Sequence, residues 1–437
     1  MSSRPLHIAW LGSAPADGGG APGVVADLLE GLTQRGHRID CFFPSAEREL
    51  APRFKELENI EFIWGTAEWR WVTWYNRVSV IAFATGLLAR GRASLRLRRE
   101  VVRRHRRDPY DLIFQNSTIE SLAVPADLAR EVPLVIRPDT HIAGELRHMV
   151  AERRLAFASQ PRYVFFTAGA VMSVRVLVQR VRIRRASLLI CISRAFRDHL
   201  VHDYRFPREA TVVIPNPVRL QRFAAPVDQP AEEDPGPPDS AHAIAAPPTV
   251  LVLGRVAARK GVEDVVALAR LLREREVYVR IRIAGGPSLW SDYRALLAGL
   301  PAENAEYAGR IDASQIPAEL AACDLLLQPS HYEPFALTVA EALAAGVPVV
   351  ATSEVGAIED VDRAVATEVR PGDIEGMASA IVAMLERLGE DRAGIAAVAR
   401  AEAERLFAPD VVCAQISDAL ERLVDGAGAG HEQMLDV

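Results

Sequence analysis

Apolar residues follow two spacings along this chain, one typical of buried strands and one typical of helices. The short apolar run "LHIAWLG" leads into a glycine-rich segment, and "VVADLLEGLTQRGH" then repeats apolar residues every three to four positions. That spacing predicts a helix with one apolar face that ends near Gly36. With "RIDCFFP" as the next strand, the order is strand, glycine loop, helix, strand. Further strands are predicted at "DLIFQ", "PLVIR" and "SLLICIS".

The same alternation starts again later in the chain. "TVLVLGRV", "VYVRIRIAGG", "LLLQPS" and "VPVVATS" read as strands, and "VEDVVALARLLRE", "IPAELAACD" and "LTVAEALAAG" read as helices. Residues 225–248 are rich in Pro, Asp and Glu, which predicts a linker or surface loop. We therefore predict two α/β domains, each a doubly wound, Rossmann-like parallel sheet, at residues 1–224 and 249–405. Residues 406–437 are expected to form a helix that packs back on the first domain, and a tail.

Composition narrows the class of protein. The 437 residues are 49% hydrophobic and carry a net charge of -6, which argues against a nucleic-acid partner. The four cysteines lie far apart, without metal-ligand spacing, as in reduced cytosolic proteins. The longest apolar stretches, near Val78–Ala89 and Tyr163–Val174, are too short to span a bilayer. We expect a cytoplasmic protein, and the preference for arginine over lysine suggests a bacterial one.

Two features leave a peripheral membrane contact open. Residues 90–107 hold nine arginines and one acid, a composition that suits either an anionic membrane at the inner leaflet or a solvated helix face. Four of the six tryptophans fall within residues 64–74. They could stack on a bound sugar ring or lie at a membrane interface, but packing inside the protein is the favoured interpretation.

Two glycine-bearing turns could bind anions. "DGGGAPG", with Gly18, Gly19 and Gly20, joins a strand to a helix, where backbone N–H groups and the helix dipole favour an anion or a hydroxyl-rich ligand. A flexible loop is the alternative. "GRVAARKG" occupies the same place in the second half, and its Arg255 and Lys260 suit a diphosphate. Lys260 is one of only two lysines in the chain, which supports a specific role.

Two glutamates stand among apolar residues in "HYEPFALTVAEALAAGVPVVAT". Glu333 is predicted in the loop after a strand, and Glu341 in a helix that starts near Leu337 and ends at Gly346. Open α/β sheets bind ligands at the carboxyl ends of their strands, and carboxylates accept hydrogen bonds from sugar and ribose hydroxyls. The alternative is that both acids pair with arginines.

These motifs resemble those of retaining glycosyltransferases of family 4, which have the GT-B architecture of two Rossmann-like domains facing across a cleft. The resemblance rests on "EPFALTVAE", "GVPVVAT", "GRVAARKG", the glycine loop with its helix, "VIPNPV", "EYAGRI" and "RPGDIEGMASAIVAML". It covers most of the chain. It implies a hexosyltransferase that moves a sugar from a nucleotide-sugar donor, with a UDP- or GDP-sugar favoured, to a small-molecule, glycan or lipid-linked acceptor. It implies no bound metal and no cofactor.

The resemblance also implies roles for single residues. Glu341 would bind the ribose, Glu333 the donor sugar, and Arg255 and Lys260 the diphosphate. Backbone N–H groups of Phe335, Ala336 and Leu337 would lie near the sugar and phosphates, and Ile311 near the base. Family members usually have a histidine after one strand of the first half; here Asp139 stands nearest that place and His141 two residues later. Either could serve as the catalytic contact, and His141 is preferred.

Two residues depart from the family pattern. Ala336 stands where glycine is usual, and Ala357 replaces a common second glycine. A non-catalytic nucleotide-sugar binder is therefore one alternative, and another GT-B enzyme, such as a sugar-nucleotide epimerase or a phosphorylase, is a second.

Overall fold

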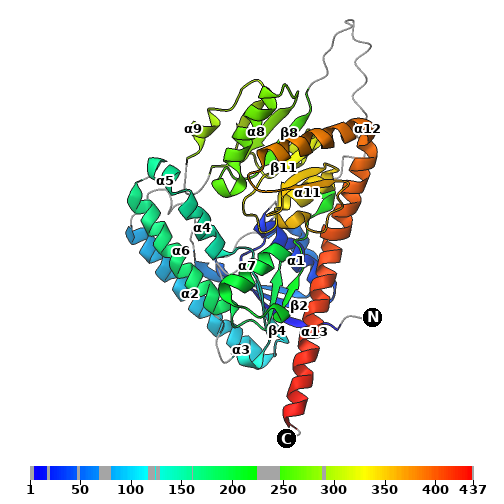
Figure 1. The fold of residues 1–437 in the computed structure, drawn as a ribbon. Coiled ribbons are helices and arrows are strands. Elements are labelled where there is room, and N and C mark those ends of the chain that lie inside the picture. Colours follow the sequence, from blue (N-terminus) through cyan, green and yellow to red (C-terminus); the bar gives the residue numbers. More distant parts are fainter. Residues whose placement is uncertain are drawn as a thin grey trace. The chain divides into compact units, whose positions relative to one another are not determined.

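Two α/β units make up the chain (Figure 1). The computed structural model describes residues 4–16, 20–46, 50–67, 80–116, 124, 128–159, 161–223, 247–287 and 292–435. Unit 1 comprises Met1–Val218 and Phe407–Val437, and unit 2 comprises Arg219–Leu406. The predicted linker at residues 225–248 lies almost wholly outside the described residues.

Unit 1 is built on a seven-stranded sheet in the order β3-β2-β1-β4-β5-β6-β7, with every neighbouring pair parallel. The central strands are apolar along their whole length because both of their faces are buried, as a parallel sheet covered by helices requires. The strands are β1 (His7–Leu11), β2 (Arg38–Ser45), β3 (Ile60–Ala67), β4 (Leu112–Asn116), β5 (Leu134–Arg137), β6 (Leu188–Cys191) and β7 (Thr211–Val213).

The helices of unit 1 connect these strands and include a helical insertion between β5 and β6. In the insertion, α6 packs against both α4 and α5. The helices are α1 (Ala21–Gln34), α2 (Val80–Arg107), α3 (Leu128–Glu131), α4 (Ile142–Ala151), α5 (Arg153–Ser159), α6 (Arg162–Ile183), α7 (Arg194–Tyr204) and α13 (Pro409–Leu435), with 3-10 turns η1 (Pro52–Glu56) and η3 (Arg208–Ala210).

The segment after residue 407 completes unit 1, because α13 packs along α1. Gly31 of α1 lies so close to Cys413 that a Cβ there would be 2.5 Å from the Cys413 sulfur. His37 ties three segments together, since its Nδ1 accepts from the backbone N–H of Leu6 at 3.1 Å and its Nε2 lies 2.7 Å from Ser417 Oγ. The two ends of unit 1 therefore share one core.

Unit 2 holds a six-stranded parallel sheet in the order β10-β9-β8-β11-β12-β13. The strands are β8 (Thr249–Leu253), β9 (Arg280–Ala284), β10 (Ala305–Gly309), β11 (Leu325–Gln328), β12 (Val349–Thr352) and β13 (Ala366–Val369). The helices are α8 (Val262–Glu274), α9 (Arg294–Leu297), α10 (Ile316–Ala321), α11 (Leu337–Ala345) and α12 (Ile374–Phe407), with 3-10 turns η4 (Leu220–Arg222), η5 (Ala258–Lys260) and η6 (Gly356–Ile358).

These two sheets confirm the predicted fold class of two Rossmann-like domains. Helix α11 begins at Leu337 and is followed by Gly346 in the left-handed conformation, as predicted. All four cysteines are buried and unpaired.

The apolar stretch Tyr163–Val174 belongs to a longer helix, α6. Arg175 interrupts the apolar run in the sequence, but the helix continues through it to Ile183. Among the described residues, α6 alone has the length and apolar composition to cross a membrane.

Candidate active site

The carboxyl edge of the unit 2 sheet brings together the predicted diphosphate turn and the loop that carries Glu333. The turn follows β8 and the loop follows β11, and these two strands are neighbours. Gly261 allows their close approach: its φ is +72°, and a Cβ there would lie 2.0 Å from the Pro329 carbonyl oxygen. The backbone N–H groups of His331 and Tyr332 also donate to the Arg259 carbonyl, at 2.9 and 3.2 Å. The turn and the loop are thus held as one structure.

Glu333 forms an ion pair at this junction. Its carboxylate pairs with Lys260 Nζ and lies 3.5 Å from Arg259 Nη1, and its side chain is 11% exposed. Burial would raise the pKa of Glu333, but the charges of Lys260 and Arg259 outweigh burial and hold the pKa below its usual range. Without a ligand, Glu333 is therefore ionised and already paired.

A second segment fixes the Glu333 loop from the other side. The Glu333 backbone N–H donates to the Glu354 carbonyl at 3.2 Å, and the Ala357 N–H donates to the Phe335 carbonyl at 2.8 Å. Ala336, which follows, has a φ of +73° and precedes the first turn of α11. This is the left-handed region, where glycine is preferred because a Cβ is crowded there. The backbone N–H groups predicted to face the sugar and phosphates thus start a helix.

Glu341 lies within α11 and is a buried carboxylate, 5% exposed. Within the described part of the chain, the carboxylate has no hydrogen bond or salt bridge. Burial raises the pKa of Glu341 to about 7, and the charge of Arg222 in η4 limits that rise. An unpaired buried carboxylate is costly, so this position is poised for a ligand that donates hydrogen bonds.

The remaining predicted donor residues occupy the same edge of the sheet. Arg255 is exposed and lines a small pocket of about 20 Å³ together with Lys260, Gly254 and Gln328. Ile311 is half-buried just after β10. Sequence reasoning missed Arg259, the second cation beside the Glu333 carboxylate. The only sequence signal for Arg259 was its position next to Lys260.

In unit 1 the structure separates the two candidates for the catalytic contact. The His141 side chain has no exposed surface, and its Nε2 lies 3.0 Å from Asp203 Oδ2 of α7. Burial lowers the pKa of His141 to about 4, although Asp203 opposes the shift. Asp139, by contrast, is half-buried just after β5. As the chain is folded here, a ligand can reach Asp139 but not the His141 ring.

Three buried polar groups, which sequence reasoning also missed, lie at the carboxyl edge of the unit 1 sheet. Trp10 stacks on Phe114, with ring centroids 4.5 Å apart, and Asn116 lies two residues beyond Phe114 on the same face. Asn116 pairs in register with Arg137, whose Nη2 donates to Asn216. Among the described residues, Trp10 Nε1, Asn116 Oδ1 and Arg137 Nε have no hydrogen-bond partner.

Arg137 is a buried cation, 1% exposed. Burial lowers its pKa to about 10, while Asp139 opposes this shift. Buried polar atoms are normally satisfied, so this group of three unsatisfied atoms on one face is a departure from the usual pattern.

The predicted glycine loop is described only in part. Gly18 and Gly19 lie outside the described residues. Gly20 directly precedes α1 with a φ of +78°, and a Cβ there would meet nothing within 4 Å.

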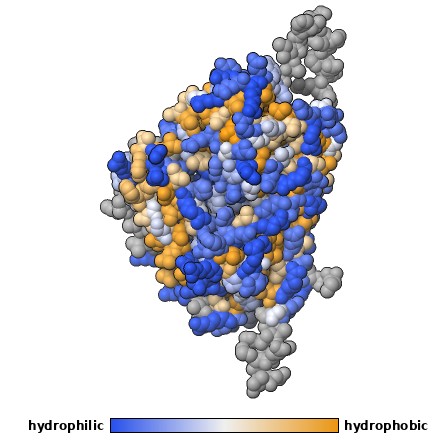
Figure 2. Space-filling view, viewed as in Figure 1, coloured by the Kyte–Doolittle hydropathy of each residue, from blue (hydrophilic) through white to orange (hydrophobic). Residues whose placement is uncertain are grey.

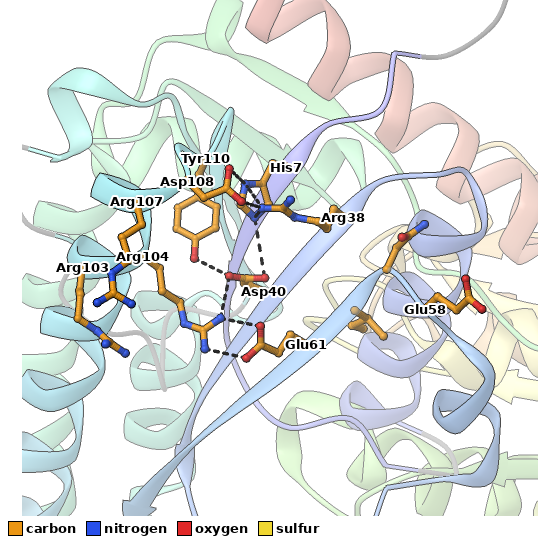
Figure 3. A pocket seen from close by; sticks show the side chains of 12 residues that line it. His7, Arg38, Asp40, Glu58, Glu61, Arg103, Arg104, Arg107, Asp108 and Tyr110 are labelled. Atoms are coloured by element: carbon orange, nitrogen blue, oxygen red, sulfur yellow. Dashed lines mark hydrogen bonds and ion pairs between the residues drawn. The ribbon is translucent and has the colours of Figure 1, made fainter.

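A different pocket, of about 520 Å³, opens at the amino edge of the unit 1 sheet (Figure 3). Its charged groups bind one another: Tyr110 donates to Asp40 at 2.7 Å, and Arg104 contacts both Asp40 and Glu61. Burial, together with the Asp40 carboxylate, raises the pKa of Tyr110. This network supports the fold, and it lies at the opposite edge of the sheet from Asn116 and Arg137.

Comparisons with known proteins agree with this arrangement. The family model "Glycosyltransferase Family 4" matches residues 18–222, and the model "Glycosyl transferases group 1" matches residues 247–387. Among curated proteins, glycogen synthase of Mycobacterium tuberculosis is 27% identical over 254 residues, which is 56% of each chain. Mannosylfructose-phosphate synthase of Agrobacterium fabrum is 32% identical over 112 residues, 24% of this chain and 25% of that protein. The chain thus spans about half the length of the glycogen synthases and about a quarter of the length of mannosylfructose-phosphate synthase.

Solved structures share the fold along almost the whole chain. Sucrose-phosphate synthase from Thermosynechococcus elongatus superposes with a TM-score of 0.65 at 20% identity, covering 96% of this chain and 100% of that one. The Anabaena protein HepE, solved in complex with UDP-glucose, gives a TM-score of 0.59 at 21% identity, covering 95% and 100%.

Proposed function

Since the chain belongs to glycosyltransferase family 4 and has the GT-B fold, we propose that it transfers a sugar from a nucleotide-sugar donor to an acceptor with retention of configuration. The observation that carries the proposal is Glu341. A buried carboxylate without a protein partner, at the carboxyl edge of a Rossmann-like sheet, is matched by the paired hydroxyls of a ribose.

The donor roles follow from the charges around Glu333. We assign the diphosphate to Arg255 and Lys260, and we add Arg259 because it shares the Glu333 ion pair. A bound diphosphate competes with Glu333 for these cations, which leaves the carboxylate available to hydroxyls of the donor sugar. The backbone N–H groups of Phe335, Ala336 and Leu337 and the amino end of α11 add positive potential. Three cations and a helix end suit transfer without a metal ion.

The likeness to HepE supports UDP-glucose as the first donor to test, with a GDP-sugar second. Ile311 is assigned to the base. The acceptor is assigned to the carboxyl edge of unit 1, where Asp139 is reachable. The acceptor is a small molecule, a glycan or a lipid-linked sugar, and we place the reaction in the cytoplasm.

Substitutions of the two glutamates test the proposal, because one should weaken nucleotide binding and the other should mainly slow transfer. Glu341→Ala removes a charged acceptor of ribose hydroxyls, so affinity for free nucleoside diphosphate should fall roughly ten- to a hundredfold. Glu333→Gln should keep most of that affinity and lose transfer, because its contacts matter as charge develops on the sugar. Calorimetric titration with UDP and GDP, together with transfer rates, measures both effects.

An exposed glutamate of α12, Glu386, supplies the matched control as Glu386→Gln. If both test variants lost nucleotide affinity equally, or if neither lost it, the proposed division of roles would be contradicted. Binding without turnover across a broad acceptor panel would favour a non-catalytic binder. Nucleotide release without an acceptor would indicate an epimerase, and dependence on inorganic phosphate a phosphorylase.

A further inference from the structure

Helix α6 presents apolar side chains on the side that faces away from its helical neighbours. Its inner residues, such as Ala168, Met172 and Ile183, are buried. The outer side carries large apolar side chains that are largely exposed: Tyr163 (69%), Phe166 (63%), Val174 (63%), Leu177 (62%), Val181 (47%) and Val178 (39%). We call these six residues the α6 stripe. At about 100° per residue they fall within an arc of about 120°, along about 27 Å of helix.

The charged residues of α6 and of the segments on either side of it in sequence are all positive. Residues 153–185 contain eight arginines and no aspartate or glutamate. Around the helix, Arg162 and Arg180 fall on one flank of the stripe, and Arg175 and Arg182 fall on the other. Arg184 and the exposed Arg185 follow its carboxyl end. In Figure 2 the apolar surface over α5 and α6 lies beside hydrophilic side chains.

We propose that the α6 stripe rests on an anionic lipid bilayer, with the helix lying in the plane of the membrane surface. An outward apolar stripe between two rows of arginines matches the boundary between acyl chains and anionic head groups. The aromatic cluster of Phe157, Phe165 and Phe166, with ring centroids 5.1 to 6.0 Å apart, sits at the α5–α6 corner and suits the interfacial region.

Two other arrangements fit the structure less well. A helix that spans the bilayer would have to leave unit 1. Gln179 holds α6 in place: it donates to the Thr140 carbonyl at 2.8 Å and accepts from the Ile142 N–H at 2.9 Å. A second copy of the chain, docked through the same surface about a two-fold axis, would set arginine against arginine with no acid on either side. An anionic bilayer satisfies the charge of this surface.

Sedimentation with vesicles tests the proposal. The wild-type chain should bind phosphatidylcholine vesicles that contain a third of phosphatidylglycerol and should not bind pure phosphatidylcholine. Tyr163→Glu and Leu177→Glu should each lower the partition coefficient at least tenfold. Arg184→Gln should lower it roughly fivefold, the effect expected for one basic side chain near an anionic surface. Tyr278→Glu is the matched control, because Tyr278 lies in unit 2 and is also 69% exposed.

Every variant changes an exposed side chain, so the thermal melting curve should stay unchanged, and this is checked first. Bound protein should be released by 0.5 M salt together with alkaline carbonate. Retention through that wash would mean a spanning helix and would overturn the proposal. So would an absence of binding to anionic vesicles, an equal effect of Tyr278→Glu, or a dimer in solution that Leu177→Glu converts to monomer.

Discussion

Replacing Glu341 with glutamine should make the ligand-free protein more stable at neutral pH. The ordinary pKa of a glutamate side chain is 4.5, and the pKa of Glu341 in the folded protein is about 7, because the carboxylate is buried without a partner. Between these pH values the folded chain holds a proton that the unfolded chain has released, so the free energy of unfolding falls as pH rises. At about 1.4 kcal/mol per pH unit, the loss amounts to about 3 kcal/mol and is complete above pH 7.

Glutamine keeps the shape of the side chain and has no group that ionises in this pH range. Glu341→Gln should therefore lack this part of the pH dependence and should exceed the wild type by up to about 3 kcal/mol at pH 8. Urea unfolding between pH 5 and pH 8, followed by circular dichroism, measures it. His141 has the opposite effect on the free energy of unfolding. Burial lowers the pKa of His141 to about 4, so its contribution to that free energy is lost as the pH falls below 6.5. The difference between variant and wild type at each pH is consequently the quantity to plot.

The same group links nucleotide binding to proton release. Hydroxyl donors favour the ionised carboxylate, so binding of a nucleoside diphosphate at pH 6 should release a proton. Titration in two buffers of different ionisation enthalpy would detect it, and Glu341→Gln should abolish it. Glu333→Gln is the control, because Lys260 and Arg259 keep the pKa of Glu333 low and the group stays ionised. Parallel pH profiles of Glu341→Gln and wild type would refute the reasoning.

Three other outcomes are expected. Lys260→Ala and Arg255→Ala should each lower the transfer rate by on the order of a hundredfold. Only Lys260→Ala should also lower the melting temperature, because it leaves the Glu333 carboxylate with Arg259 alone. Equal melting temperatures of the two variants would contradict the buried ion pair. Ala336→Gly should stabilise the fold by roughly 0.5–1 kcal/mol, since φ is +73°, and a loss of stability in denaturant unfolding would show that the Ala336 methyl packs productively. Asp139→Asn should lower kcat without changing the melting temperature. His141→Ala should lower the melting temperature, because the His141 ring is wholly buried. A loss of kcat at unchanged melting temperature in His141→Ala, with a loss of stability in Asp139→Asn, would restore His141 as the sugar contact.

The sequence predicted the inner strands of both sheets and missed the outermost ones. The four strands without a prediction, β3, β7, β10 and β13, are the two edges of each sheet. Central strands are buried on both faces and therefore read as apolar runs, but edge strands such as "ATEV" mix polar residues into a short segment. The pattern that predicts a parallel strand thus weakens where the sheet ends.

Site residues were predicted where a motif has local spacing and missed where the partner lies far away in sequence. Glu333 and Lys260 were predicted individually, yet their ion pair depends on the approach of the β8 and β11 turns at Gly261. The Lys260 side chain is only 17% exposed, because it pairs with this distant carboxylate. Likewise, nothing near His141 in sequence indicates that its ring is buried beside Asp203. Arg137 and Asn116 looked like ordinary strand ends, and only their pairing in register places two unsatisfied groups together.

The packing of α13 on α1 has a consequence for biosynthesis. Unit 2 is continuous in sequence, so all of its strands have left the ribosome once residue 406 is made. Unit 1 must wait for residues 407 onward, because the face of α1 around Gly31 and the ring of His37 are completed by Cys413 and Ser417. The first half of the chain to emerge is thus the last to finish folding. Until then its uncovered apolar surface is a natural place for a chaperone to bind.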